Sequence, residues 1–473
     1  GMRPGRHRMP GERSRTQGEM DGGGALRREV GLPGAVLLGL GAMVGTGVFV
    51  SIGLAAGVAG PALLAATLLA ALVATANGLS TAQLAAAHPV SGGTYEYGYR
   101  WLSPAFGFAA GWLFLLAKSA SAATAAMGLA GYLLELLGLG GDGARVPRTA
   151  IGIAAALGIT AFVAGGIRRS NRGNAVIVTV TLAGLAALVV TAIPAIVPER
   201  LANFTPFLPR GSAGEGGAAE DGAAVGMGDA GAAGGVGALL HGAALMFVAF
   251  TGYGRIATLG EEVRDPERVI PRAVILTMAI VTALYLGVGF AGVGVLGAAA
   301  FGDAAERTAA PLEAVAVALG SPALAGLVSV AAVTAMAGVL LNLVLGLSRV
   351  LLAMARRGDA PAYLSRIDEA RASPVASVWT CGALVAAVAL TGNVRIAWSF
   401  SAFTVLVYYA ITNLAALRLP AEQRRFPRWI PAAGLVGCLT LAFWVEPGVW
   451  LAGSALLALG LGVRAVVRRG RAG

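Results

Sequence analysis

Long hydrophobic runs separated by short polar segments divide this chain into twelve candidate spans. Crossing a bilayer takes about 20 consecutive apolar residues in a helix, and a lone strand cannot satisfy its backbone hydrogen bonds in lipid. The pattern therefore predicts twelve membrane-spanning helices, numbered in chain order as spans 1 to 12. They cover residues 33–57, 61–86, 104–137, 147–166, 174–196, 236–259, 270–297, 322–352, 374–391, 396–417, 429–445 and 448–466.

The composition supports an all-α polytopic membrane protein. Hydrophobic residues make up 57% of the chain and charged residues 12%, whereas about 25% of a soluble domain is charged. The spans contain almost no His, Cys, Asp or Glu that could cluster, so we expect neither an enzyme nor a cofactor or metal site. Residues 1–31 are polar and rich in Arg and Gly, which predicts a disordered tail.

The formal net charge of +11 reflects arginines in the short loops between spans. If the N-terminus is cytoplasmic, the loops on that side hold most of these arginines, as the positive-inside pattern requires. We interpret the charge as membrane topology and expect no nucleic-acid partner. The prediction is a multi-pass protein of the inner cell membrane with both termini in the cytoplasm.

Span 1 contains a glycine-rich stretch, GLGAMVGTGVF, at Gly39–Phe49. A dinucleotide-binding turn would need an acidic residue about 20 positions later, but no Asp or Glu occurs between Glu29 and Glu96. Two interpretations remain. Gly41 and Gly45 form a G-x-x-x-G pair that allows close helix packing, or the helix is broken so that its freed backbone groups bind a ligand. The stretch alone does not decide between them.

A second interrupted segment lies at the centre of span 6, at Phe250-Thr251-Gly252-Tyr253-Gly254. Interrupted spans at matching places in two halves are a sequence indicator of a transporter's binding site. Spans 1 and 6 match if two five-helix repeats of inverted topology are followed by two further helices, which favours the broken-helix interpretation. The predicted units are a tail at 1–31, repeats at 32–196 and 236–417, a flexible loop at 197–235, and spans 11 and 12 with a tail at 418–473.

Four motifs spread over the chain resemble the amino acid–polyamine–organocation superfamily of permeases, most of all bacterial relatives of cationic amino acid transporters. The motifs are GAMVGTGVF (Gly41–Phe49), PVSGGTYEYG (Pro89–Gly98), FTGYGRIATLGEEVRDPERVIPRA (Phe250–Ala273) and LGLSRVLLAMARRGDAP (Leu345–Pro361). The resemblance implies the five-plus-five inverted-repeat transporter fold with broken helices 1 and 6. It also implies alternating access.

A broken span 1 would present free N–H groups to an anion and free carbonyls to a cation. The resemblance implies that a substrate carboxylate lies on the backbone around Gly45, Thr46 and Gly47, and that the ammonium lies near Met43 and the centre of span 6. No acidic residue occupies that centre, which favours neutral or apolar amino acids. The candidate substrate-binding residues are Met43, Val44, Gly45, Thr46, Gly47, Val248, Ala249, Phe250, Thr251 and Gly252.

Lys118, within span 3, is the only lysine among the 35 Lys and Arg residues. A cation at that depth costs about 2.5–3.5 kcal/mol on insertion scales, and a buried Lys, unlike Arg, can lose its proton. Our hypothesis is that its ammonium either replaces a coupling sodium ion or titrates during transport. Some family members carry such a lysine in span 5, where this chain has none. Span 8 offers only Thr334 as a hydroxyl ligand, which favours a coupling proton over sodium.

These observations favour a secondary transporter that takes up amino acids together with protons. An exchanger of amino acids or amines without net ion coupling is the alternative, and a channel or membrane receptor is an alternative of another class. Glu135, at the outer end of span 3, is expected to be solvated.

Overall fold

The structure, a computed structural model, describes residues 31–88, 92–166, 171–209, 234–257, 263, 265–368, 371 and 373–472. These residues are almost entirely helical and contain no strand, and an isolated bridge joins Asp368 and Ser373. The predicted tail at 1–31 lies outside the described residues except for Gly31, as does most of the predicted loop at 197–235.

The helices of the first half follow the predicted spans to within a few residues. They are α1 (Leu32–Met43), η1 (Gly47–Ser51), α2 (Ile52–Ala59), η2 (Gly60–Ala62), α3 (Leu63–Ala87), α4 (Thr94–Trp101), α5 (Pro104–Leu136), η3 (Asp142–Ala144), α6 (Arg145–Ala164), α7 (Asn171–Ala192), η4 (Ile193–Ala195) and η5 (Pro198–Phe204).

The second half of the chain is also built from helices. Its helices are α8 (Gly234–Phe250), η7 (Thr251–Tyr253), α9 (Gly254–Ala257), α10 (Pro266–Leu296), α11 (Ala298–Arg307), α12 (Pro311–Ala318), α13 (Pro322–Arg357), η8 (Ala362–Ser365), α14 (Val375–Ala389), α15 (Val394–Leu417), η9 (Ala421–Gln423), α16 (Trp429–Ala442) and α17 (Pro447–Ala472).

Within the described residues, nine helical segments are long and apolar enough to cross a membrane. Three shorter apolar helices, α1, α14 and α16, accompany them. Many large apolar side chains are exposed along these helices, as a lipid environment requires. The chain is therefore a polytopic membrane protein, and the part that the structure describes is almost entirely helical.

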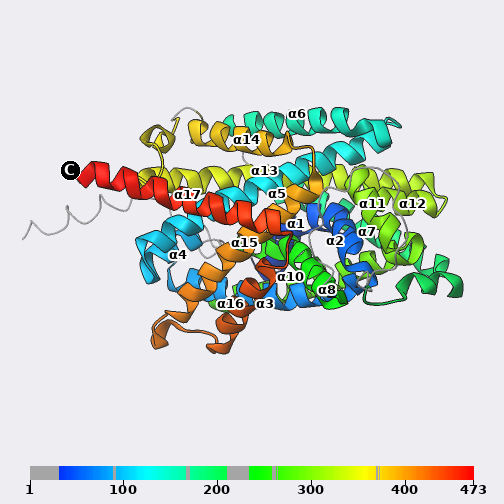
Figure 1. Cartoon of the computed structure of the whole chain (residues 1–473), viewed down its shortest axis with the longest axis horizontal. Helices are drawn as coiled ribbons and strands as arrows, with labels where there is room; N and C mark the ends of the chain where they lie inside the picture. Colours follow the sequence, from blue (N-terminus) through cyan, green and yellow to red (C-terminus); the bar gives the residue numbers. More distant parts are fainter. Residues whose placement is uncertain are drawn as a thin grey trace, which may run out of the picture.

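The helices pack in two groups. The α5 group consists of α5, α6, α13 and α14, which contact one another, with the α5–α13 pair the most extensive. The α3 group consists of α1 with α2, α3, α8 with α9, and α10, which also contact one another. In Figure 1 α5, α13 and α17 run close to the horizontal axis, with α4 toward the left end and α11 and α12 toward the right. We call these the α4 end and the α11–α12 end.

Candidate functional site

The first helix break lies in span 1. Helix α1 ends at Met43, Val44 has an extended conformation with φ −80° and ψ 96°, and helical geometry resumes at Thr46. The N–H groups of Val48 and Phe49 both bond back to the Gly45 carbonyl. Among the described backbone bonds outside regular helices, none starts from the N–H of Gly45, Thr46 or Gly47. The break thus has the free N–H groups of a helix start inside the protein.

Thr46 adds an unused hydroxyl to this break. Its side chain is 4% exposed, and its Oγ1 has no hydrogen-bond partner among the described residues. A buried polar group without a partner costs about 1–3 kcal/mol. Such a group is expected where a ligand supplies the missing partner.

The second break lies in span 6. Helix α8 ends at Phe250, a 3-10 turn follows at Thr251–Tyr253, and the helix resumes as the short α9. The Thr251 hydroxyl donates to the Val248 carbonyl at 2.8 Å. The Tyr409 hydroxyl, from α15, lies 3.4 Å from the Thr251 carbonyl.

The two breaks lie against each other, and glycine is what permits this. A Cβ on Gly252 would lie 2.6 Å from both the carbonyl carbon and the oxygen of Ala42, and a Cβ on Gly47 would lie 2.5 Å from the Ala249 Cβ. Real Cβ atoms essentially never lie within 3.0 Å of such neighbouring atoms. The glycines therefore serve close packing as well as the break, so the two interpretations of Gly39–Phe49 describe the same feature.

Tyr285, from α10, connects the two breaks. Its hydroxyl oxygen lies 2.8 Å from the Met43 carbonyl oxygen and 3.2 Å from that of Ala249. The side chain is fully buried. These carbonyls belong to the ends of α1 and α8, so one hydroxyl occupies the place where the carbonyls of both broken helices converge.

Lys118 reaches the same region from α5. Its Nζ donates to the Thr251 Oγ1 at 2.9 Å, and the side chain is 8% exposed. In the part of the chain that the structure describes, no carboxylate pairs with it. The ammonium is therefore held by a hydroxyl that in turn donates to the span 6 backbone.

Hydrogen bonds close the α11–α12 end. The Tyr132 hydroxyl donates to the Phe49 carbonyl at 2.7 Å and accepts from the Leu312 N–H at 3.1 Å, which ties the second half of span 1 to α12. Arg395 at the start of α15 pairs with Glu306 of α11 at 2.9 Å and with Glu446 at 3.0 Å.

The α4 end is closed by a buried polar cluster around Asp359, which follows α13. Asp359 accepts hydrogen bonds from the hydroxyls of Tyr95 and Tyr99 and pairs with Arg464 of α17, Nε to Oδ1, at 3.2 Å. Burial, and then the Asp359 carboxylate, raises the pKa of Tyr95, so this hydroxyl keeps its proton and donates. Both ends are thus held by hydrogen bonds and ion pairs, and the residues of the breaks are buried or partly buried.

The structure gathers the candidate residues into one buried region. All of them are buried except Gly252, which is partly buried. Tyr285 was not among the residues that the sequence singled out. A tyrosine in the apolar span 7 was the available signal, but only the packing shows that it faces the breaks.

Two interrupted helices that meet inside a helical membrane protein are typical of membrane transporters. The family model for amino acid permeases matches residues 34–466. The chain therefore belongs to the amino acid permease family, and it is not an enzyme. This confirms the resemblance to the amino acid–polyamine–organocation superfamily.

Similar proteins are transporters as well. The chain is 39% identical to an uncharacterised transporter of Mycobacterium tuberculosis, over 94% of this chain and 93% of that protein. It is 27% identical to a branched-chain amino acid permease of Bacillus subtilis, over 94% and 90%. It is 25% identical to a methylthioribose transporter of the same organism, over 90% of each. Two cationic amino acid transporters of Arabidopsis thaliana are also similar to this chain.

Proposed function

We propose that this permease is a secondary active transporter that takes up neutral or apolar amino acids by alternating access, coupled to protons. The observation that carries the proposal is the meeting of two helix breaks with Lys118 at a buried site. The relative described as a branched-chain amino acid permease supports apolar amino acids as the first substrates to test.

The proposed architecture has twelve spans in two inverted five-helix repeats followed by two further helices, in the inner cell membrane with both termini cytoplasmic. The three shorter apolar helices and the nine long ones together supply the segments for this count. The α3 group contains spans 1, 2, 6 and 7, and the α5 group contains spans 3, 4, 8 and 9. That grouping pairs equivalent members of the two repeats and supports the proposal.

In the proposed complex, the substrate carboxylate binds the N–H groups of Gly45–Gly47 and the Thr46 hydroxyl. The ammonium binds the carbonyls of Met43 and Ala249, which Tyr285 contacts in this structure. The substrate side chain lies against Val248 and Thr251. An ammonium has three donors, whereas the tyrosine hydroxyl has one, so the substrate can satisfy both carbonyls together.

Lys118 is proposed as the coupling residue. Its Nζ contacts Thr251, which belongs to the same turn as the proposed substrate site. Loss or gain of the Lys118 proton would change the hydrogen bond to the span 6 turn, and this links protonation to the geometry of the site.

Uptake by proteoliposomes tests this function. We expect the protein to concentrate labelled leucine or valine when the outside is acidic, and to do so less when a protonophore collapses the gradient. Lys118→Ala is expected to abolish the pH dependence of uptake. Lys118→Arg is expected to abolish it as well, because arginine keeps the positive charge but does not lose its proton. Unchanged pH-dependent uptake by correctly inserted Lys118→Ala would eliminate the coupling role. Rapid counterflow with no effect of pH would favour the exchanger.

A further inference from the structure

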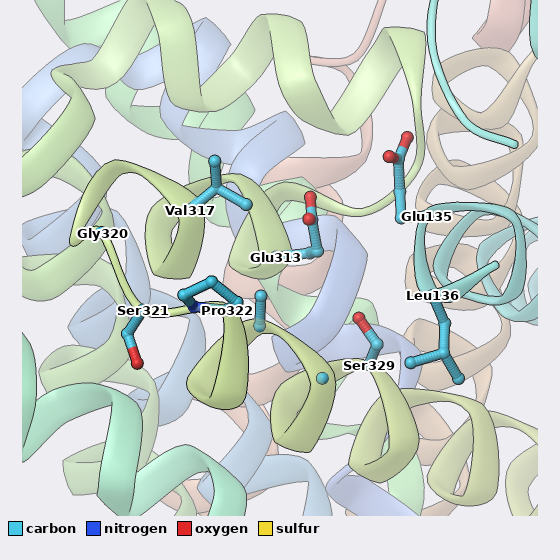
Figure 2. A pocket seen from close by; sticks show the side chains of 10 residues that line it. Glu135, Leu136, Glu313, Val317, Gly320, Ser321, Pro322 and Ser329 are labelled. Atoms are coloured by element: carbon cyan, nitrogen blue, oxygen red, sulfur yellow. The ribbon is translucent and has the colours of Figure 1, made fainter. Parts of the chain in front are cut away.

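A cavity whose lining residues do not include those of the helix breaks lies at the α11–α12 end. It has a volume of about 380 Å³ and lies between the end of α5, helix α12 and the start of α13. That volume falls in the range of small-molecule sites, roughly 300–1,000 Å³. Figure 2 shows its lining side chains. They are Glu135, Leu136, Glu313, Val317, Gly320, Ser321, Pro322, Ala325, Gly326 and Ser329.

Two carboxylates enter this cavity from different helices. Glu135 lies at the end of α5 and Glu313 in the first turn of α12. Both are partly buried, so Glu135 is only partly exposed to solvent. None of the lining residues is basic. Burial, and then the charge of Glu135, raises the pKa of Glu313.

An independent feature of the cavity is the Ser329 hydroxyl. Ser329 is 1% exposed, and its Oγ has no hydrogen-bond partner among the described residues. In Figure 2 this hydroxyl points from α13 into the cavity, toward the side on which Glu313 lies. Ser329 therefore adds a buried hydroxyl without a partner to the lining of the cavity that holds the two carboxylates.

The remaining lining is mostly apolar, with Leu136, Val317, Pro322 and Ala325 around the acidic side chains. A bound divalent metal would need about six or more oxygen ligands for Ca²⁺, or tight octahedral geometry for Mg²⁺. The described residues hold no group of three or more His, Cys, Asp or Glu placed to bind one. A cavity of this size with an apolar wall suits a cationic head on a hydrocarbon body.

We propose that this cavity binds a protonated organic amine, with its ammonium between Glu135 and Glu313 and a hydrogen bond to the Ser329 Oγ. The carboxylate of an amino acid would be repelled by the same two glutamates. The site therefore selects amines that lack a carboxylate, and it is separate from the helix breaks.

The test is binding of 3-methylbutylamine to the purified, detergent-solubilised protein by isothermal titration calorimetry. The matched neutral probe is 3-methylbutan-1-ol, which has the same hydrocarbon body and a hydroxyl head. We expect the amine to bind at least about tenfold more tightly than the alcohol. Glu135→Gln and Glu313→Gln are each expected to weaken the amine about tenfold or more, and Ser329→Ala severalfold. Lys118→Ala, at the helix breaks, is expected to leave its Kd unchanged.

Equal binding of amine and alcohol, or undiminished amine binding by both glutamine variants, would overturn the proposal. So would loss of amine binding in Lys118→Ala alone, which would move the ligand to the helix breaks. Thermal stabilisation by CaCl₂ but not by the amine would show a metal site instead. Ser329→Ala keeps both charges, so it remains informative if a glutamine variant does not fold.

Discussion

The hydrogen bond between Lys118 and Thr251 allows a quantitative test of the region around the helix breaks. Thr251→Val keeps the shape of the side chain and removes its hydroxyl, which accepts from Lys118 at 2.9 Å and donates to Val248 at 2.8 Å. Hydrogen bonds between membrane helices average about 0.6 kcal/mol in double-mutant cycles, with a maximum near 1.7, whereas those to charged groups reach about 1.5–3 kcal/mol. We therefore expect a coupling energy between the two side chains of about 1–2 kcal/mol.

The measurement is a double-mutant cycle with Thr251→Val, Lys118→Met and the combined variant, using free energies of unfolding in mixed micelles. Lys118→Met removes the ammonium but retains much of the aliphatic stem. Thr46→Val is the matched control, because the Thr46 hydroxyl has no partner to lose. We expect the control to be neutral or slightly stabilising in the absence of substrate. Additive effects of the two variants, with a coupling energy below about 0.5 kcal/mol, would refute the contact.

Three further predictions concern the breaks and the two ends of the protein. Gly252→Ala should abolish uptake and lower thermal stability in micelles, since its Cβ would lie 2.6 Å from the Ala42 carbonyl; normal uptake would show that the breaks need not touch. Asp359→Asn should lower the free energy of unfolding by about 3–5 kcal/mol, because it leaves Arg464, 10% exposed, without its carboxylate. Breaking the exposed Arg425–Glu267 pair with Glu267→Gln should cost at most about 0.5 kcal/mol; equal losses would argue against a special role for Asp359. Burial opposes the ionisation of Glu446, but His241 and Arg395 hold its pKa at about 2. Because this pKa lies below its unfolded value, stability should be fully present above about pH 4.5 and fall by about 1–2 kcal/mol as the pH drops toward 2. Glu446→Gln should flatten that part of the stability curve relative to the parent, and an unchanged slope would contradict the assignment.

The helices were largely predictable because membrane spans are long and apolar. The predicted span at 104–137 corresponds to α5 at Pro104–Leu136. The end of α13 was less accessible to hydropathy: the span was predicted to end at 352, but the helix continues to Arg357, and Gly358 with φ 80° ends it. Polar residues that extend a helix beyond the membrane do not appear in an apolar pattern.

The contacts around the breaks were harder to predict because they join distant parts of the chain. Lys118 was distinguished by composition alone, but its partner lies 133 residues away. The glutamates of the amine-binding cavity also come from separate helices, and nothing in either local sequence indicates the other. Hydropathy gives the position of a residue along a span, whereas these contacts depend on how the spans are rotated against each other.

Helix α17 has two attachments to the α5 group, and they determine how it behaves if the two groups move relative to each other. Trp112 of α5 donates its indole N–H to the Leu456 carbonyl at 2.9 Å, and Arg464 binds Asp359 just beyond α13. Two anchors at different heights resist both sliding and rotation, so α17 should travel with α5 and α13 as one rigid body. A fluorophore attached to α17 would thus serve as a reference for the α5 group, and a second label on α1 would report any movement of the α3 group relative to it.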